Sequence, residues 1–115
     1  MRRGEIFWAR LSPRSGAEQA GARPVLVVSH DAFNQTPSWA SIIVVPLTTS
    51  EAQGRRGPTA IPLPAGTAGL KKGSVALCHQ VTTLDRAKLT ARVGVLPPEV
   101  LARIEDGLRA ALDLA

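Results

Sequence analysis

The sequence predicts a mainly β protein: a small curled antiparallel barrel with a single C-terminal helix. Short runs rich in β-branched residues, joined by turns rich in Gly and Pro, recur along most of the chain. Apolar residues at helical spacing follow only after residue 97. With 115 residues, of which 44% are hydrophobic and 20% charged, the chain has the composition of a folded protein, and we expect one domain over residues 1–115.

The first two strands are expected at Gly4–Leu11 and Gly21–Ser29, separated by a loop rich in Gly and Pro. The second strand begins with Arg23 and Pro24 and continues as an unbroken valine and leucine run, which is typical of a strand covered on both faces. Pro24 biases Arg23 toward extended geometry, so the arginine stands at the mouth of a rigid strand, where it can be aimed at a phosphate. An ordinary solvated arginine at a strand end is the alternative.

Two further strands are expected at Ser41–Thr48 and Thr59–Pro64. Pro46 inside the first of them indicates a bulge or an edge, because proline has no N–H to donate to a ladder. Hydroxyl side chains gather where that strand ends, at residues 48–50. Before it, Asp31 is expected to cap a short turn over residues 32–34.

The rest of the chain predicts a fifth strand at Ser74–Val81, a single turn over Arg86–Lys88 capped by Asp85, and a last strand at Arg92–Leu96. Pro98 and Glu99 suit the first turn of a helix. Its apolar positions then recur at helical spacing: Val100 or Leu101, Ile104, Leu108 and Leu112. Gly107 costs such a helix about 1 kcal/mol relative to alanine, so packing is expected to hold it.

The charge balance favours a polyanionic partner. The net charge is +5, and residues 1–96 carry 12 Lys and Arg against 5 Asp and Glu, whereas residues 97–115 carry 2 against 4. The basic loop with Arg55 and Arg56 is as compatible with nucleic-acid contact as with plain solvation. Phe33, Trp39 and Trp8 are the available stacking residues, and Trp8 is expected in the core.

Several chemistries find no support in the sequence. No His, Cys, Asp or Glu residues show metal-ligand spacing, and no nucleotide-binding or nucleophile-elbow motif is present. Cys78 is the only cysteine and is expected to be a small buried residue, and His79 a core or interface histidine. No run is long enough to span a membrane and no signal peptide is expected, so we expect a cytoplasmic protein.

Several motifs together resemble one family. They are GEI at residues 4–6, GAEQAGARPVLVVS at 16–29, VPLT at 45–48, QV at 80–81 and LD at 84–85. In order and spacing these motifs look like the MazF/PemK family of toxin endoribonucleases. Two positions depart from its pattern, Ala17 before the motif glutamate and Thr82 after Gln80-Val81.

The resemblance implies an SH3-like barrel, a homodimer, and sequence-specific cleavage of single-stranded RNA without a metal or other cofactor. It also implies a cognate antitoxin, which we expect to bind through an acidic C-terminal tail. The family's catalytic arginine and threonine fall on Arg23 and Thr48, its motif glutamate on Glu18, and an RNA-contacting glutamine on Gln80. We add Thr49 as a contact to base edges and Arg14, Arg55 and Arg56 as contacts to phosphates.

The chemistry of RNA self-cleavage agrees with this assignment. The reaction needs a cation for the phosphorane oxygens, which Arg23 supplies as a planar fork, and a hydroxyl to hold the phosphate, which Thr48 supplies. Arginine stays protonated in proteins, so Glu18 is either the base or an ion-pair partner that orients Arg23, and we favour the second role.

Two alternatives are a toxin of the same barrel type that binds DNA gyrase and a catalytically silent RNA-binding module. The gyrase-binding relatives act through an aromatic tip on the C-terminal helix, whereas residues 112–115 here read LDLA.

Overall fold

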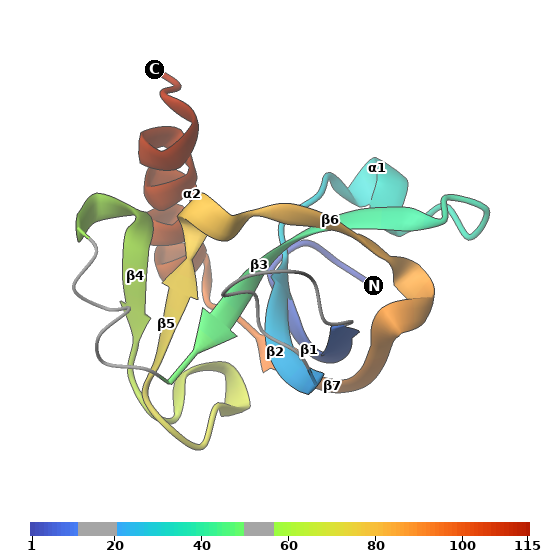
Figure 1. The fold of residues 1–115 in the computed structure, drawn as a ribbon, viewed down its shortest axis with the longest axis horizontal. Coiled ribbons are helices and arrows are strands. Elements are labelled where there is room, and N and C mark those ends of the chain that lie inside the picture. Colours follow the sequence, from blue (N-terminus) through green and yellow to red (C-terminus); the bar gives the residue numbers. More distant parts are fainter. Residues whose placement is uncertain (12–20, 50–56) are drawn as a thin grey trace.

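The computed structural model describes residues 1–11, 21–49 and 57–115. Seven strands form one antiparallel sheet in the order β4-β5-β3-β2-β1-β7, and β6 pairs with β3 off this path (Figure 1). The strands are β1 Glu5–Leu11, β2 Gly21–Val27, β3 Ser41–Thr48, β4 Ala60–Leu63, β5 Ser74–Leu77, β6 Thr82–Asp85 and β7 Leu89–Val95. The helices are α1 Asp31–Asn34 and α2 Pro98–Leu112, with single 3₁₀ turns at Gly57–Thr59, Thr67–Gly69, Cys78–Gln80 and Arg86–Lys88.

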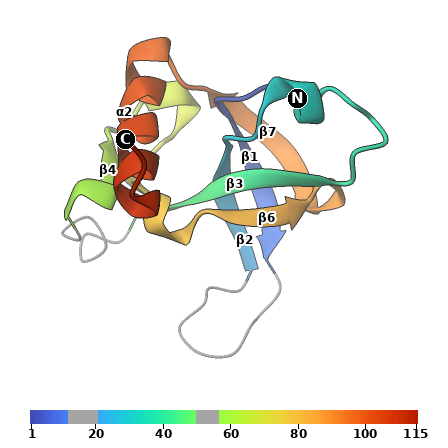
Figure 2. The same ribbon diagram turned by 90° about the horizontal axis from the view of Figure 1, so that it is seen from above.

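The expected class, mainly β with a C-terminal helix, is confirmed, but the sheet does not close into a barrel. β4 and β7 are the two ends of the sheet order and are not paired with each other within the described ranges. The sheet is strongly curled, as two views turned by 90° show (Figures 1 and 2).

The expected fifth strand, Ser74–Val81, is wrong in its second half. β5 ends at Leu77, the chain makes a 3₁₀ turn at Cys78–Gln80, and the separate strand β6 follows. The turn directs Cys78 toward α2, where its thiol donates to the carbonyl oxygen of Ile104 (Sγ···O 3.7 Å). β6 then pairs with β3 in a new register. Thr82–Asp85 therefore form a strand that the sequence did not predict.

Pro46 lies in the interior of the sheet, because β2 pairs with one edge of β3 and β5 and β6 pair with the other. The expected edge position is therefore wrong, but the expected irregularity is present. On the second edge the pairing changes from Leu47 with Ala76 to Val44 with Thr82, so the register shifts across the proline.

Two apolar clusters occupy the two faces of the sheet. The larger one packs under α2 and includes Leu26, Val45, Leu47 and Ile104, while the smaller one on the opposite face includes Val25 and Val44. Alternation along β2 and β3 sends neighbouring residues into different clusters, which explains the unbroken apolar runs of both strands. Apolar packing therefore holds β2 and β3 on both faces of the sheet. Arg23 and Thr48 lie at the ends of these packed segments.

Gly107 is required by the close packing of α2 on the sheet. A Cβ at this position would lie 2.8 Å from Cys78 Sγ and 2.9 Å from Ile61 Cγ1. Glycine lowers the helix propensity of α2, but its lack of a side chain lets α2 approach the sheet closely. The expectation that packing holds the helix at Gly107 is confirmed.

Three further expectations need correction. Trp8 is 42% exposed instead of buried in the core. His79 is exposed, which rules out the core position and leaves the interface position that was its alternative. The N-cap of α1 is His30, whose Nδ1 accepts from the Ala32 N–H (2.9 Å), and Asp31 is the first residue of the helix. The Asp85 cap over Arg86–Lys88 is confirmed, because its carboxylate accepts from the Ala87 N–H.

A buried carboxylate ties β1 to β7 and predicts a loss of stability in acid. Glu5 is 6% exposed and accepts from the Arg2 N–H and from Arg92 Nε. Burial raises the pKa of Glu5, but these hydrogen bonds and the Arg92 charge outweigh it, and the net pKa lies below the ordinary 4.5. A lowered folded-state pKa means that the ionised form contributes stability above the unfolded-state value and loses it as the pH falls through the folded-state value.

We therefore expect Glu5→Gln to lower the free energy of unfolding by about 1 to 2 kcal/mol at pH 7. Urea unfolding of both proteins at stepped pH should show this gap closing as the pH falls below 4.5, the ordinary value, because the wild type alone loses the ionised pair. A gap that stays constant down to strongly acid pH would contradict this role for the carboxylate.

Candidate active site

Arg23 and Thr48 lie where β2 and β3 separate. The ladder between these strands pairs Val27 with Val44 and ends at Val25 with Pro46. If this register were continued by two residues beyond Val25 and Pro46, Arg23 would stand opposite Thr48. Because side chains alternate along a strand, Arg23 and Thr48 then lie on the same face of the sheet as Val25 and Pro46. Beyond Pro46, β3 leaves β2 and pairs with β5 through Leu47 and Thr48 (Figure 1). The two residues thus stand on either side of the opening between the strands.

The Arg23 backbone is held within the sheet, but one donor of its side chain has no acceptor among the described residues. Arg23 pairs with Ala9 on β1, whose small side chain is fully buried, and the arginine itself is half-buried. Its Nε atom is buried and has no hydrogen-bond partner among the described residues. A buried N–H without an acceptor costs about 1–3 kcal/mol, so such a group in a native protein calls for an explanation in function.

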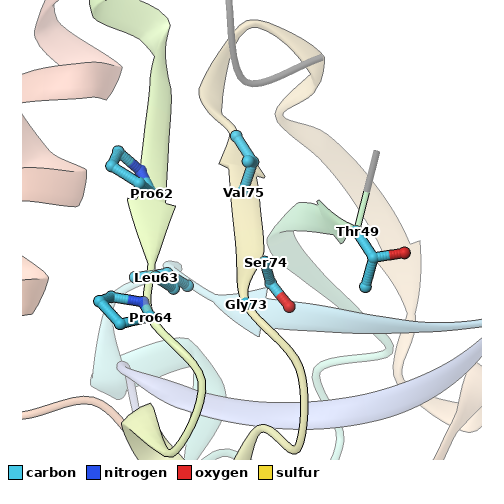
Figure 3. A pocket seen from close by; sticks show the side chains of 7 residues that line it. All are labelled: Thr49, Pro62, Leu63, Pro64, Gly73, Ser74 and Val75. Carbon is cyan, nitrogen blue, oxygen red and sulfur yellow. The ribbon is translucent and has the colours of Figure 1, made fainter. Parts of the chain in front are cut away.

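Thr48 and Thr49 present hydroxyl-bearing side chains at the end of β3. Thr48 is 5% exposed and pairs with Val75 on β5, so its backbone is fixed by that neighbouring strand. Thr49 is exposed and lines a shallow pocket of about 420 Å³ between this strand end and the β4–β5 pair (Figure 3). The other lining residues are Pro62, Leu63, Pro64, Gly73, Ser74 and Val75.

Ser74 is a polar residue of this pocket that sequence reasoning missed. It is 6% exposed, and its hydroxyl donates to the carbonyl oxygen of Lys72 (3.2 Å). The only signal in the sequence was a small polar residue directly after Gly73 at a strand start, which is too common to single out.

Gln80 lies beside the same strand as Thr48. It is the last residue of the 3₁₀ turn between β5 and β6. Along the chain it lies between Ala76, which pairs with Leu47 of β3, and Thr82, which pairs with Val44 of β3. Its side chain is exposed. The four residues thus lie around the second half of β3: Arg23 on its β2 side, Gln80 on its β5 and β6 side, and Thr48 and Thr49 at its end. Glu18, Arg14, Arg55 and Arg56 lie outside the described residues, and their roles stay predictions.

The remaining reactive side chains do not join this region. Cys78 is fully buried, and burial raises the pKa of its thiol to about 11, so it remains neutral and serves as packing. His79 Nδ1 lies 3.4 Å from Thr59 Oγ1 on the surface. Over the described ranges no three His, Cys, Asp or Glu side chains gather where a metal ion might bind. Within the same ranges no helix has the length and apolar character needed to cross a bilayer.

Comparison with known proteins identifies the class of protein to which this arrangement belongs. Residues 2–112 match the family of PemK-like, MazF-like toxins of type II toxin–antitoxin systems. Endoribonuclease MazF6 of Mycobacterium tuberculosis is 38% identical over 112 residues, which cover 97% of this chain and 96% of that protein. The crystal structure of MazF from Deinococcus radiodurans superposes with a TM-score of 0.79 at 27% identity, covering 99% of this chain and 97% of that one.

A mycobacterial endoribonuclease in complex with its cognate antitoxin is also similar, with a TM-score of 0.75 and 25% identity over 100% of this chain and 95% of that one. The match to the family model spans nearly the whole chain and includes the β2 and β3 segments that carry Arg23 and Thr48. The chain belongs to the PemK-like, MazF-like toxin family of type II toxin–antitoxin systems.

Proposed function

We propose that this toxin, an endoribonuclease of the MazF type, cleaves single-stranded RNA with Arg23 and Thr48 and without a metal ion. The observation that carries the proposal is the position of these two residues on one face, at the point where β2 and β3 separate. A guanidinium whose buried Nε has no partner among the described residues, and a hydroxyl side chain on a residue that β5 holds in place, are the groups that an RNA phosphate needs.

In the proposed reaction the 2′-hydroxyl oxygen attacks the adjacent phosphorus. The new 2′-O–P bond forms as the bond from phosphorus to the 5′-oxygen breaks, leaving a 2′,3′-cyclic phosphate on one fragment and a 5′-hydroxyl on the other. Negative charge grows on the non-bridging oxygens, where the Arg23 fork stabilises it. Thr48 holds the scissile phosphate in line for the attack.

As the bonds to phosphorus exchange, the 2′-oxygen loses its proton and the departing 5′-oxygen gains one, so the step consumes no net proton. Arg23 stays protonated, so it does not take the 2′-hydroxyl proton. In the proposal Glu18 pairs with Arg23 and orients it, while Gln80 and Thr49 read base edges. Arg14, Arg55 and Arg56 neutralise phosphates further along the strand.

The proposal extends to the assembly and its setting. We propose a cytoplasmic homodimer built from one toxin domain spanning residues 1–115, inhibited by a cognate antitoxin whose acidic C-terminal tail occupies the RNA site. Exposed apolar side chains at the end of α2, Leu112 at 53% and Leu114 at 59%, support a surface that a second copy covers. A similar mycobacterial endoribonuclease in complex with its antitoxin supports the inhibitory partner.

A cleavage assay with the purified protein tests the proposed function. A long single-stranded RNA incubated in EDTA should be cut at a small set of recurring sequences, because the proposed groups are all side chains of the protein. Cleavage that disappears in EDTA and returns with Mg²⁺ or Mn²⁺ would contradict the metal-free mechanism. RNA that is shifted in a gel but stays intact would show a binding module, and inhibition of gyrase without RNA cleavage would show the other toxin type.

A further inference from the structure

Two exposed aromatic rings stack on each other next to α1. The centroids of Phe33 and Trp39 lie 4.7 Å apart with an angle of 26° between the rings. His30 meets Phe33 edge-on at 6.2 Å. Phe33 is 41% and Trp39 47% exposed, although the whole chain has only four Phe and Trp residues. We call Phe33 and Trp39 the aromatic platform.

The segment that carries the platform is held in place by one arginine. Arg86 donates to four backbone carbonyl oxygens: from Nε to Trp39 (2.9 Å), from Nη1 to Asn34 (2.8 Å), and from Nη2 to Phe33 (3.0 Å) and Thr36 (3.2 Å). The backbone on both sides of the stack is therefore fixed before any ligand binds. Rigid aromatic surfaces lose little conformational entropy on binding.

Arg86 places a positive charge next to the platform. The hydrogen bonds that Arg86 makes to described residues go to carbonyl oxygens and none to a carboxylate, so its charge is not neutralised by an ion pair within the described ranges. The side chain is only half-buried. A flat aromatic surface beside a guanidinium that makes no ion pair within the described ranges fits a ligand that has both a π-face and an anionic group, which is the chemistry of a nucleotide.

The platform lies at the end of β3 away from Thr48. Trp39 comes two residues before β3 begins at Ser41, and Thr48 ends the strand. Seven steps along a strand span about 23 Å. In Figure 1, α1 and the end of β3 lie on opposite sides of the molecule. A base on the platform would thus be several nucleotides away from a phosphate held by Arg23 and Thr48.

We propose that the aromatic platform is a second RNA subsite, which stacks one unpaired base of the substrate several nucleotides from the cleaved bond. This inference rests on the proposed function, because it takes RNA as the substrate. It predicts that an RNA long enough to reach from Thr48 to Trp39 binds more tightly than a minimal one. The gain comes from stacking, so it requires an aromatic ring at residue 39 and tolerates different bases.

The test compares a minimal RNA, which spans only the cleaved sequence, with the same RNA extended by an adenylate tract on its 5′ or its 3′ side. For the wild type, one of the two extensions should lower KM. Trp39→Ala should raise KM for that extended RNA about 10-fold and leave kcat, and both constants for the minimal RNA, unchanged. Trp39→Phe should behave like the wild type and Trp39→Leu like the alanine variant, because leucine is apolar but cannot stack. Val95→Ala, a truncation of another exposed apolar residue (40% exposed), is the control and should change nothing.

Equal KM values of wild type and Trp39→Ala on every extended RNA would overturn the inference. A Trp39→Leu variant that binds the extended RNA with full affinity would also overturn it, because it would show a plain apolar contact. So would a Trp39→Ala variant that loses self-association or antitoxin binding without a change in KM. Cleavage of the minimal RNA by the wild type tests the proposed function separately, so the failure of one is distinguishable from the failure of the other.

Discussion

Replacing Arg23 with lysine is expected to lower kcat for RNA cleavage by about 100- to 1,000-fold, although the charge is kept. An ammonium group is a point charge and cannot offer two parallel donors to the phosphorane oxygens, as the planar guanidinium does. Arg23→Ala should lose at least as much. Single-turnover cleavage at saturating RNA measures the loss, because it separates chemistry from binding.

The fold should survive both changes, because Arg23 is half-buried beyond the last β2–β3 pair and leaves no core cavity when truncated. Urea unfolding is the control for stability. A lysine variant that cleaves RNA at close to the wild-type rate would show that Arg23 does not act as a fork on the phosphate.

Thr48→Val is the second change with a large expected effect, about 100-fold on kcat, while Thr48→Ser should retain most of the activity. Valine keeps the shape of the side chain in its 5% exposed site and removes only the hydroxyl. Serine keeps the hydroxyl and removes a methyl group. Comparing the two under single-turnover conditions therefore separates the chemistry of the hydroxyl from the packing of the residue.

Thr49→Val is the matched control for this pair. Thr49 is the exposed neighbour and lines the pocket beside β4 and β5, so its loss should affect KM and sequence preference more than kcat. If Thr48→Val cleaved RNA as fast as Thr48→Ser, the hydroxyl would have no part in the reaction.

The strands and the helix that were predicted well from the sequence are those with strong local signals. β3 follows its expected bounds because an apolar run ends in hydroxyl residues, and α2 begins at Pro98 because proline and glutamate mark a first turn. The division between β5 and β6 was not predictable, because the turn at Cys78 depends on its packing against Ile104 in α2. Whether a curled sheet closes is also decided by its distant edges, here β4 and β7.

Arg23 and Thr48 could be chosen as candidates from the sequence, but their position relative to each other could not be predicted. The position of Arg23 before Pro24 and the hydroxyls after β3 marked both residues, but only the β2–β3 register brings them to the same opening. Exposure of the aromatic residues was predicted less well. Trp8 was expected in the core but is 42% exposed. No local pattern shows that Arg86 would fix the segment between Phe33 and Trp39.

The most direct test of the proposed mechanism is the fate of an RNA in which a single 2′-hydroxyl, the one next to the cleaved bond, is replaced by hydrogen. If the 2′-oxygen is the nucleophile, the unmodified RNA yields fragments with a 2′,3′-cyclic phosphate and a 5′-hydroxyl. The substituted RNA should then bind with similar affinity but remain uncut at that bond, and mass spectrometry of the products distinguishes these ends. Cleavage of the substituted RNA at the same bond, or fragments with a 3′-hydroxyl and a 5′-phosphate, would show that water is the nucleophile and would contradict the roles given to Arg23 and Thr48.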